Sequence, residues 1–109
     1  MKLNVLERIS VLQILPKESN IAMLKIVRDL QGLLALSEAE VISIGFKVEG
    51  DNMLWNEKKA VDKDINFGEV ASKMIADELK KLDGANSLKA SHLSLWEKFV
   101  DVEGENEKK

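Results

Sequence analysis

Apolar residues recur at helical spacing through the first 45 residues of the chain. Asn4 can cap a helix whose apolar residues between positions 5 and 12 form one stripe. Pro16 ends this helix, because proline has no amide hydrogen with which to continue the hydrogen-bond ladder. A second helix is predicted over residues 21–35, after a short polar connection.

The second predicted helix carries a broad apolar arc. Ser19 or Asn20 can cap it, and Lys25 and Arg28 lie opposite the apolar positions. Because the arc is broad, we expect this helix to be the one most enclosed by the others. Gly32 either weakens the helix slightly or admits a close neighbour.

A capping box and a glycine delimit a short third helix. Ser37 and Glu40 have the spacing at which a serine oxygen and a glutamate carboxylate satisfy each other's backbone amides. Apolar residues between positions 41 and 44 follow, and Gly45 supplies the positive φ that commonly closes a helix. The pattern predicts a helix that starts after Ser37 and stops at Gly45.

After Gly45 the apolar spacing changes from helical to alternating. Residues 46–49 and 53–56 flank Gly50-Asp51-Asn52, which predicts a β-hairpin with a three-residue turn. A lone hairpin is marginally stable in water, so this one is expected to lie on other elements. The charged residues 57–64 predict a surface loop, and residues 65–67 predict a short third strand.

Helical spacing returns in the last third of the chain. A fourth helix is predicted from Gly68 to about Gly84, and a fifth from about Lys89 to Val100. The predicted fold is α+β and mainly helical, with about five helices and a small two- or three-stranded antiparallel sheet. We expect one globular domain over residues 1–100 and a flexible charged tail over residues 101–109.

Three consecutive apolar residues, Met53, Leu54 and Trp55, stand in the second hairpin strand. Strand alternation sends Leu54 to the face opposite Met53 and Trp55, so both faces of the sheet need cover. A buried tryptophan removes ~150–250 Å² from water, and a hairpin flank is an odd place to leave one exposed. This segment predicts an interface with a protein partner or a second copy of the chain.

Composition narrows the chemistry that the chain can perform. The 109 residues include one histidine, no cysteine and no tyrosine, while 45% are hydrophobic. No thiolate site or disulfide can form, and nucleophiles and bases are too few to predict an enzyme. We expect no cofactor and no metal.

Charge and hydropathy bear on partners and location. The net charge is −3, and the last nine residues, with four acids and two lysines, contribute −2, which leaves −1 for residues 1–100. Because the positive and negative charges of residues 1–100 nearly cancel, this part of the chain has no net attraction for phosphate backbones. Nucleic acid is therefore disfavoured as a partner. Without a long apolar run or a secretion signal, a cytoplasmic protein with no membrane partner is expected.

Two side chains are candidates for acid–base chemistry. His92 lies at helical spacing with apolar residues, so it is expected to fill a core edge and hydrogen-bond one ring nitrogen. Glu78 falls on an apolar helical face, where it either carries a raised pKa beside a pocket or pairs with Lys81. An enzyme would rest on these two residues alone, and the structural interpretation is favoured for both.

One loop has the spacing of a calcium site without fitting the full motif. Asp62, Asp64 and Asn66 have the spacing of calcium ligands, but the sixth and twelfth positions are Phe67 and Lys73 instead of glycine and glutamate. Calcium binding is therefore not predicted.

Lys58, Lys59 and Lys63 follow Trp55 and form a local basic cluster that neighbouring acids largely cancel. In a symmetric oligomer, two such clusters with Trp55 offer a pocket for a phosphate-bearing ligand. The candidate interface or ligand residues are therefore Met53, Leu54, Trp55, Lys58 and Lys59.

Two stretches carry a resemblance to a group of proteins. Residues 15–28, which begin Leu-Pro-Lys-Glu-Ser-Asn, and residues 92–99, His-Leu-Ser-Leu-Trp-Glu-Lys-Phe, resemble small uncharacterised proteins encoded by bacteriophages and prophages. The resemblance extends over most of the chain up to Val100 and contains no diagnostic motif. It implies a bacterial host and an accessory role by binding a host protein or, against immune signalling, a small nucleotide messenger.

These observations together predict a non-enzymatic phage-type accessory protein that binds a host or phage protein, including a role in counter-defence. Two alternatives remain open. The first is an oligomer that sequesters a small nucleotide ligand. The second is a structural or assembly factor of a phage particle.

Overall fold

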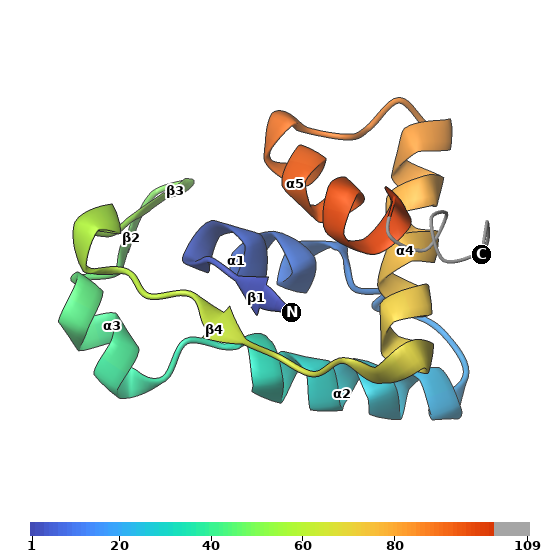
Figure 1. Cartoon of the computed structure of the whole chain (residues 1–109), viewed down its shortest axis with the longest axis horizontal. Helices are drawn as coiled ribbons and strands as arrows, with labels where there is room; N and C mark the ends of the chain where they lie inside the picture. Colours follow the sequence, from blue (N-terminus) through green and yellow to red (C-terminus); the bar gives the residue numbers. More distant parts are fainter. Residues whose placement is uncertain (102–109) are drawn as a thin grey trace.

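Helices make up most of the computed structural model, which describes residues 1–101 (Figure 1). Within these residues there are five α-helices and four short strands, which confirms the mainly helical α+β fold. In chain order the elements are β1 (Lys2–Leu3), α1 (Val5–Ile14), α2 (Ile21–Leu34), α3 (Glu38–Ile44), β2 (Lys47–Glu49), β3 (Asn52–Leu54), η1 (Glu57–Lys59), β4 (Lys63–Asp64), α4 (Gly68–Gly84), η2 (Ala90–His92), α5 (Leu93–Trp96) and η3 (Glu97–Asp101). Asp101, assigned to the tail from the sequence, ends the helical segment η3, and the rest of the predicted tail lies outside the described residues.

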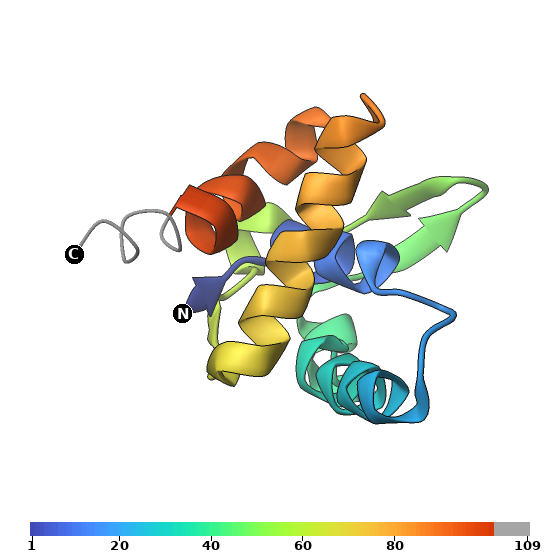
Figure 2. The same cartoon turned by 90° about the vertical axis from the view of Figure 1, so that its right-hand side faces the viewer.

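The core forms around α1, which contacts α2 on one side and α4, η2 and α5 on the other (Figures 1 and 2). Phe67 and Phe99 meet edge to face in this core, with ring centroids 5.3 Å apart. The fully or almost fully buried apolar residues of the main cluster are Leu3, Val11, Leu15, Val27, Leu30, Leu34, Ile65, Ala71, Met74, Ile75, Ala76, Leu79, Leu95 and Phe99.

The prediction that α2 is the most enclosed helix is wrong. Its buried residues are Val27, Leu30 and Leu34, and Ile21 at its start is 71% exposed. Neighbouring elements cover one side of α2, which lies along the edge of the molecule (Figure 1). The breadth of an apolar arc gives the area that a helix can bury, but the number of neighbours decides how much of it is buried.

The local helix signals are confirmed. The side chains of Asn4, Asn20 and Ser37 accept hydrogen bonds from the third backbone amide of α1, α2 and α3 respectively. Ser37 and Glu40 form the predicted capping box, and Gly45 ends α3 in the left-handed conformation with φ 64°. These contacts span three or four residues, so the sequence specifies them without help from the tertiary fold.

The strands form two separate two-stranded antiparallel sheets, β1 with β4 and β2 with β3. The predicted third strand at residues 65–67 is wrong, since strand pairing ends at Asp64 and Ile65 enters the core. The amide of Ile65 donates to the carbonyl of Met1 at 2.8 Å, so this segment joins the N-terminal residues and not the hairpin. A two-residue strand such as β1 is too short to carry a detectable alternation.

The hairpin exists, but its turn has two residues instead of the predicted three. Asn52 pairs with Glu49 as the first residue of β3, which leaves Gly50 and Asp51 in the turn. Gly50 has φ 61°, and Asp51 has no positive φ. A positive φ at the first of the two turn residues is typical of a type II′ turn. The backbone twist of this turn matches the twist of the two flanking strands, which favours a two-residue connection over a longer one.

A buried arginine joins three helices. The Arg8 side chain is fully buried, and its Nε and Nη2 donate to the carbonyls of Leu34 and Ala35 at 3.1 and 2.8 Å. Its guanidinium also binds both carboxylate oxygens of Glu40, at 2.6 and 3.2 Å. Arg8 on α1 therefore satisfies the C-terminal carbonyls of α2 and neutralises a carboxylate in the first turn of α3.

A second ion pair holds the C-terminal helical segment to α1. Lys98 Nζ donates to Glu7 Oε1 and to the Lys2 carbonyl, both at 2.8 Å. Glu7 also completes a capping box by accepting from the Asn4 amide. Burial raises the pKa of Glu7, but the hydrogen bonds from Lys98 and Asn4 and the charge of Lys98 outweigh it and lower that pKa.

Among the helices that the structure describes, none combines the length and the apolar character needed to cross a bilayer.

Candidate functional site

The β2–β3 hairpin separates its side chains onto two faces of different character. In the observed register Lys47 lies opposite Leu54, Val48 opposite Met53 and Glu49 opposite Asn52. Alternation places Phe46, Val48, Met53 and Trp55 together, and we call these four residues the hairpin apolar face. Leu54 lies on the other face with the charged residues of β2, as the sequence predicts.

Trp55 anchors the base of the hairpin apolar face. Its ring stacks on Phe46, with centroids 6.0 Å apart and planes 23° apart. Its Nε1–H donates to Glu57 Oε2 at 2.6 Å. Both rings are half-buried, so each presents part of its apolar surface to solvent.

The rest of the hairpin is exposed. Val48 is 60% exposed, Met53 40% and Leu54 41%. The hairpin projects from the helical body (Figure 2), and α3, which leads into it, exposes Ile42 by 75%. The hairpin and α3 therefore bring several large apolar side chains to one exposed end of the molecule (Figure 1).

Lys58 and Lys59 lie next to this surface on the short helix η1. Both are exposed, and the Asn56 side chain caps η1 by accepting from the Lys58 amide at 3.1 Å. The carboxylate nearest to them in sequence, Glu57, is bound to the Trp55 indole. Two members of the predicted basic cluster thus adjoin the hairpin on a solvated turn. The third, Lys63, lies on β4, where its Nζ donates to the Leu33 carbonyl at 2.9 Å.

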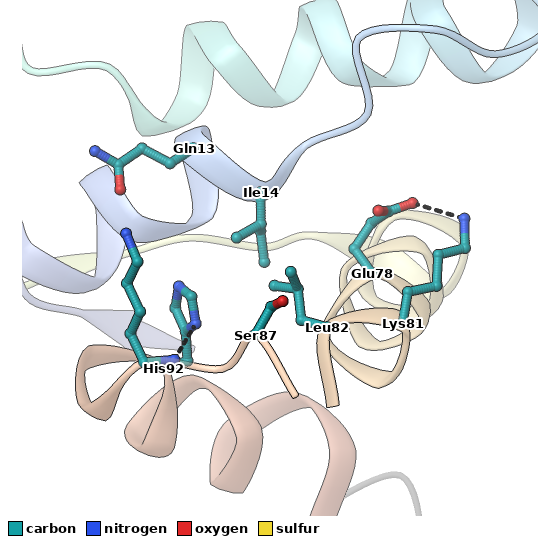
Figure 3. A pocket seen from close by; sticks show the side chains of 8 residues that line it. Gln13, Ile14, Glu78, Lys81, Leu82, Ser87 and His92 are labelled. Atoms are coloured by element: carbon teal, nitrogen blue, oxygen red, sulfur yellow. Dashed lines mark hydrogen bonds and ion pairs between the residues drawn. The ribbon is translucent and has the colours of Figure 1, made fainter. Parts of the chain in front are cut away.

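A cavity of about 450 Å³ lies elsewhere, between the end of α1, the second half of α4 and the segment that leads into η2 (Figure 3). Its lining residues are Gln13, Ile14, Glu78, Lys81, Leu82, Ser87, Lys89 and His92. The fold thus brings Glu78 and His92, the two candidates for acid–base chemistry, to one open hollow whose apolar lining residues are Ile14 and Leu82.

The hydrogen bond of His92 fixes which ring nitrogen carries the proton. His92 is 5% exposed, and its Nδ1 accepts from the Lys89 amide at 3.0 Å. Burial first, and then the charge of Lys89, lower the pKa of His92, so the ring is neutral near pH 7 with its proton on Nε2. In Figure 3 the second ring nitrogen points toward the side of the cavity formed by Gln13 and Ile14, where it offers a donor. A general base needs the opposite tautomer.

Two other polar side chains of the cavity, Glu78 and Ser87, bind their own neighbours. Glu78 accepts from Lys81 Nζ at 3.1 Å, which is the structural interpretation that the sequence favours. Ser87 Oγ donates to the Ala85 carbonyl at 3.3 Å. The contacts of these side chains therefore run to the backbone or to Lys81, and not from a nucleophile to a base.

Three comparisons, with models of protein families, with curated proteins and with solved structures, gave no match to this chain.

Two buried charged residues were not identified from the sequence as important. Arg8 stands three residues after Val5 and three before Val11, so helical spacing places it on the buried stripe of α1. The second buried charged residue is Glu7, which has the spacing of a capping box with Asn4. A charged residue on an apolar stripe is the signal that reveals a buried ion pair before the structure is known.

Proposed function

We propose that this chain is a non-enzymatic accessory protein that binds a protein partner through the hairpin apolar face. The observation that carries the proposal is the exposure of Val48 and Met53 beside the stacked rings of Phe46 and Trp55. A contiguous apolar patch with a half-buried tryptophan is typical of a protein interface, because aromatic anchors contribute most of the energy of binding.

The resemblance to phage proteins indicates which class of partner to expect. It makes the expected partner a bacterial host protein, bound in counter-defence, or a phage protein. The assembly-factor alternative uses the same surface and differs in the partner, which is then a structural component of a phage particle. Identification of the captured protein distinguishes these alternatives.

Affinity capture from bacterial lysate, followed by a binding measurement with the purified partner, tests the proposal. Met53→Ser and Trp55→Ala should weaken the binding, the tryptophan change by ~30-fold or more if it is a hot spot. Ile21→Ser is the matched control, because Ile21 is 71% exposed on α2, away from the hairpin. Equal affinity of all three variants for the partner, or the absence of any partner, would contradict the proposal.

The ligand-sequestering alternative is favoured by one observation. Lys58 and Lys59 are exposed beside Trp55 and offer cations to a phosphate-bearing ligand. Native mass spectrometry after incubation with small nucleotide messengers should then show a retained ligand mass that Lys58→Ala or Lys59→Ala reduces. Retention of no such mass by the wild-type protein rejects this alternative.

A further inference from the structure

The outer edge of β2 is an open strand edge. Among the described residues β2 pairs with β3 alone, and all three of its residues are exposed. In a two-residue hairpin the closing pair, here Glu49 and Asn52, exchanges hydrogen bonds, and the next pair does not. Val48 therefore directs its amide and carbonyl away from β3, toward the open edge.

The sequence of β2 is complementary in charge to itself when two copies run antiparallel. With a two-fold axis through Val48, Lys47 of one copy lies opposite Glu49 of the other, and this happens twice. The side chains of Lys47 and Glu49 are 62% and 59% exposed and lie 3.0 Å apart as an ion pair within the strand. Both charges therefore stand on one face, available to an opposing strand.

Other ways of pairing lack this complementarity. A parallel arrangement of two β2 strands in the same register places lysine beside lysine and glutamate beside glutamate, which destabilises the pair. The edge of β3 carries Asn52, Met53 and Leu54, whose side chains bear no charge to set a register. Charge complementarity thus favours β2 against β2 in antiparallel orientation.

We propose that two copies of the chain associate through their β2 edges, antiparallel about Val48, to form a four-stranded sheet in the order β3-β2-β2-β3. The two Val48 residues exchange backbone hydrogen bonds on the axis, and a Lys47–Glu49 pair flanks the axis on each side. The association uses the strand edge and brings the two hairpin apolar faces together as one surface. It goes beyond the proposed binding of a partner protein, since the edge can pair whether or not that face binds another protein.

Charge reversal on β2 tests the arrangement, with the mass measured by sedimentation at about 100 µM because three-residue strands give a small interface. Lys47→Glu alone and Glu49→Lys alone place like charges opposite each other twice, so each variant should dimerise at least about tenfold more weakly than the wild type. The two single variants mixed together, one of them isotope-labelled, should form a heterodimer. The double variant Lys47→Glu/Glu49→Lys restores complementarity and should dimerise like the wild type.

Proline substitutions identify the edge. Val48→Pro removes the amide that points outward from β2 and should abolish the dimer, while Met53→Pro makes the same change on β3 and should leave it. Circular dichroism establishes that each variant is folded. A monomeric wild type, single charge variants as dimeric as the wild type, a mixture that forms no heterodimer, or loss of the dimer in Met53→Pro alone would each overturn the proposal.

Discussion

Arg8 connects α1, α2 and α3 through one buried guanidinium. Truncation to alanine would leave the Leu34 and Ala35 carbonyls without their donor and Glu40 without its cation. Breaking a buried pair by removing one partner commonly costs about 3–5 kcal/mol. We predict that Arg8→Ala lowers the free energy of unfolding by about that amount in chemical denaturation.

The matched control for Arg8 is Arg28, which pairs with Asp29 at the surface, where both side chains are 71% exposed. Exposed ion pairs contribute about 0–1 kcal/mol, so Arg28→Ala should change the free energy of unfolding little. Equal effects of Arg8→Ala and Arg28→Ala would show that the buried guanidinium does not stabilise the fold.

Glu40 makes the stability depend on pH in the acid range. Hydrogen bonds from Arg8, with a smaller contribution from the Ser37 amide and against the effect of partial burial, lower the pKa of Glu40 from 4.5 to about 2. A carboxyl group whose pKa is depressed in the folded state stabilises that state above its unfolded pKa and loses this effect as pH falls through the folded value. The free energy of unfolding should therefore decrease from about pH 5 toward pH 2.

Denaturation curves at several pH values check this prediction. Glu40→Gln should be less stable than the wild type near neutral pH, and the difference should narrow toward pH 2. Glu18→Gln, in the exposed connection before α2, should follow the wild-type profile. A difference between Glu40→Gln and the wild type that stays constant down to pH 2 would disprove the assignment to Glu40.

At the level of helices, two glycines have opposite expected effects. Gly32 lies within α2, and a Cβ added there would meet no atom within 4 Å. Gly32→Ala should raise the free energy of unfolding by about 0.5–1 kcal/mol, because alanine favours the helix and restricts the unfolded chain. The structure thus decides that Gly32 weakens α2 and does not admit a close neighbour.

Gly45 ends α3 with φ 64°, where a side chain strains the backbone whatever space surrounds it. Gly45→Ala should lower the free energy of unfolding by about 1 kcal/mol or more. Thermal unfolding of the two variants side by side checks both signs. Shifts of the same sign would contradict the structural difference between the two positions.

At the level of the whole molecule, the exposed hairpin predicts a homo-oligomer. Light scattering on the wild type at about 100 µM, the concentration that a small strand-edge interface requires, should give the mass of a dimer. Trp55→Ala removes the ring that stacks on Phe46 and should shift the protein toward monomer or aggregate. Lys59→Ala, on the exposed turn η1, should leave the mass unchanged. A strictly monomeric wild type would contradict this prediction and would leave Trp55 only its proposed contact with a partner protein.

The sequence by itself determined the features that depend on near neighbours in the chain. The caps at Asn4, Asn20 and Ser37, the stop at Gly45 and the alternation around Gly50 each involve residues a few positions apart. Their hydrogen bonds and backbone angles are local, so residue type and spacing are enough to predict them. The two faces of the hairpin follow from the same alternation.

The tertiary structure alone decided the features that join distant parts of the chain. The pairing of β1 with β4, the partial exposure of α2 and the meeting of Glu78 with His92 at one cavity depend on how helices pack. The contacts of Arg8 with the end of α2 and with Glu40 cross 26 to 32 positions. Periodicity shows that a residue faces the interior. It does not show which residue it meets there, because the hydrophobic effect is non-directional and the contacts depend on how all the elements pack together.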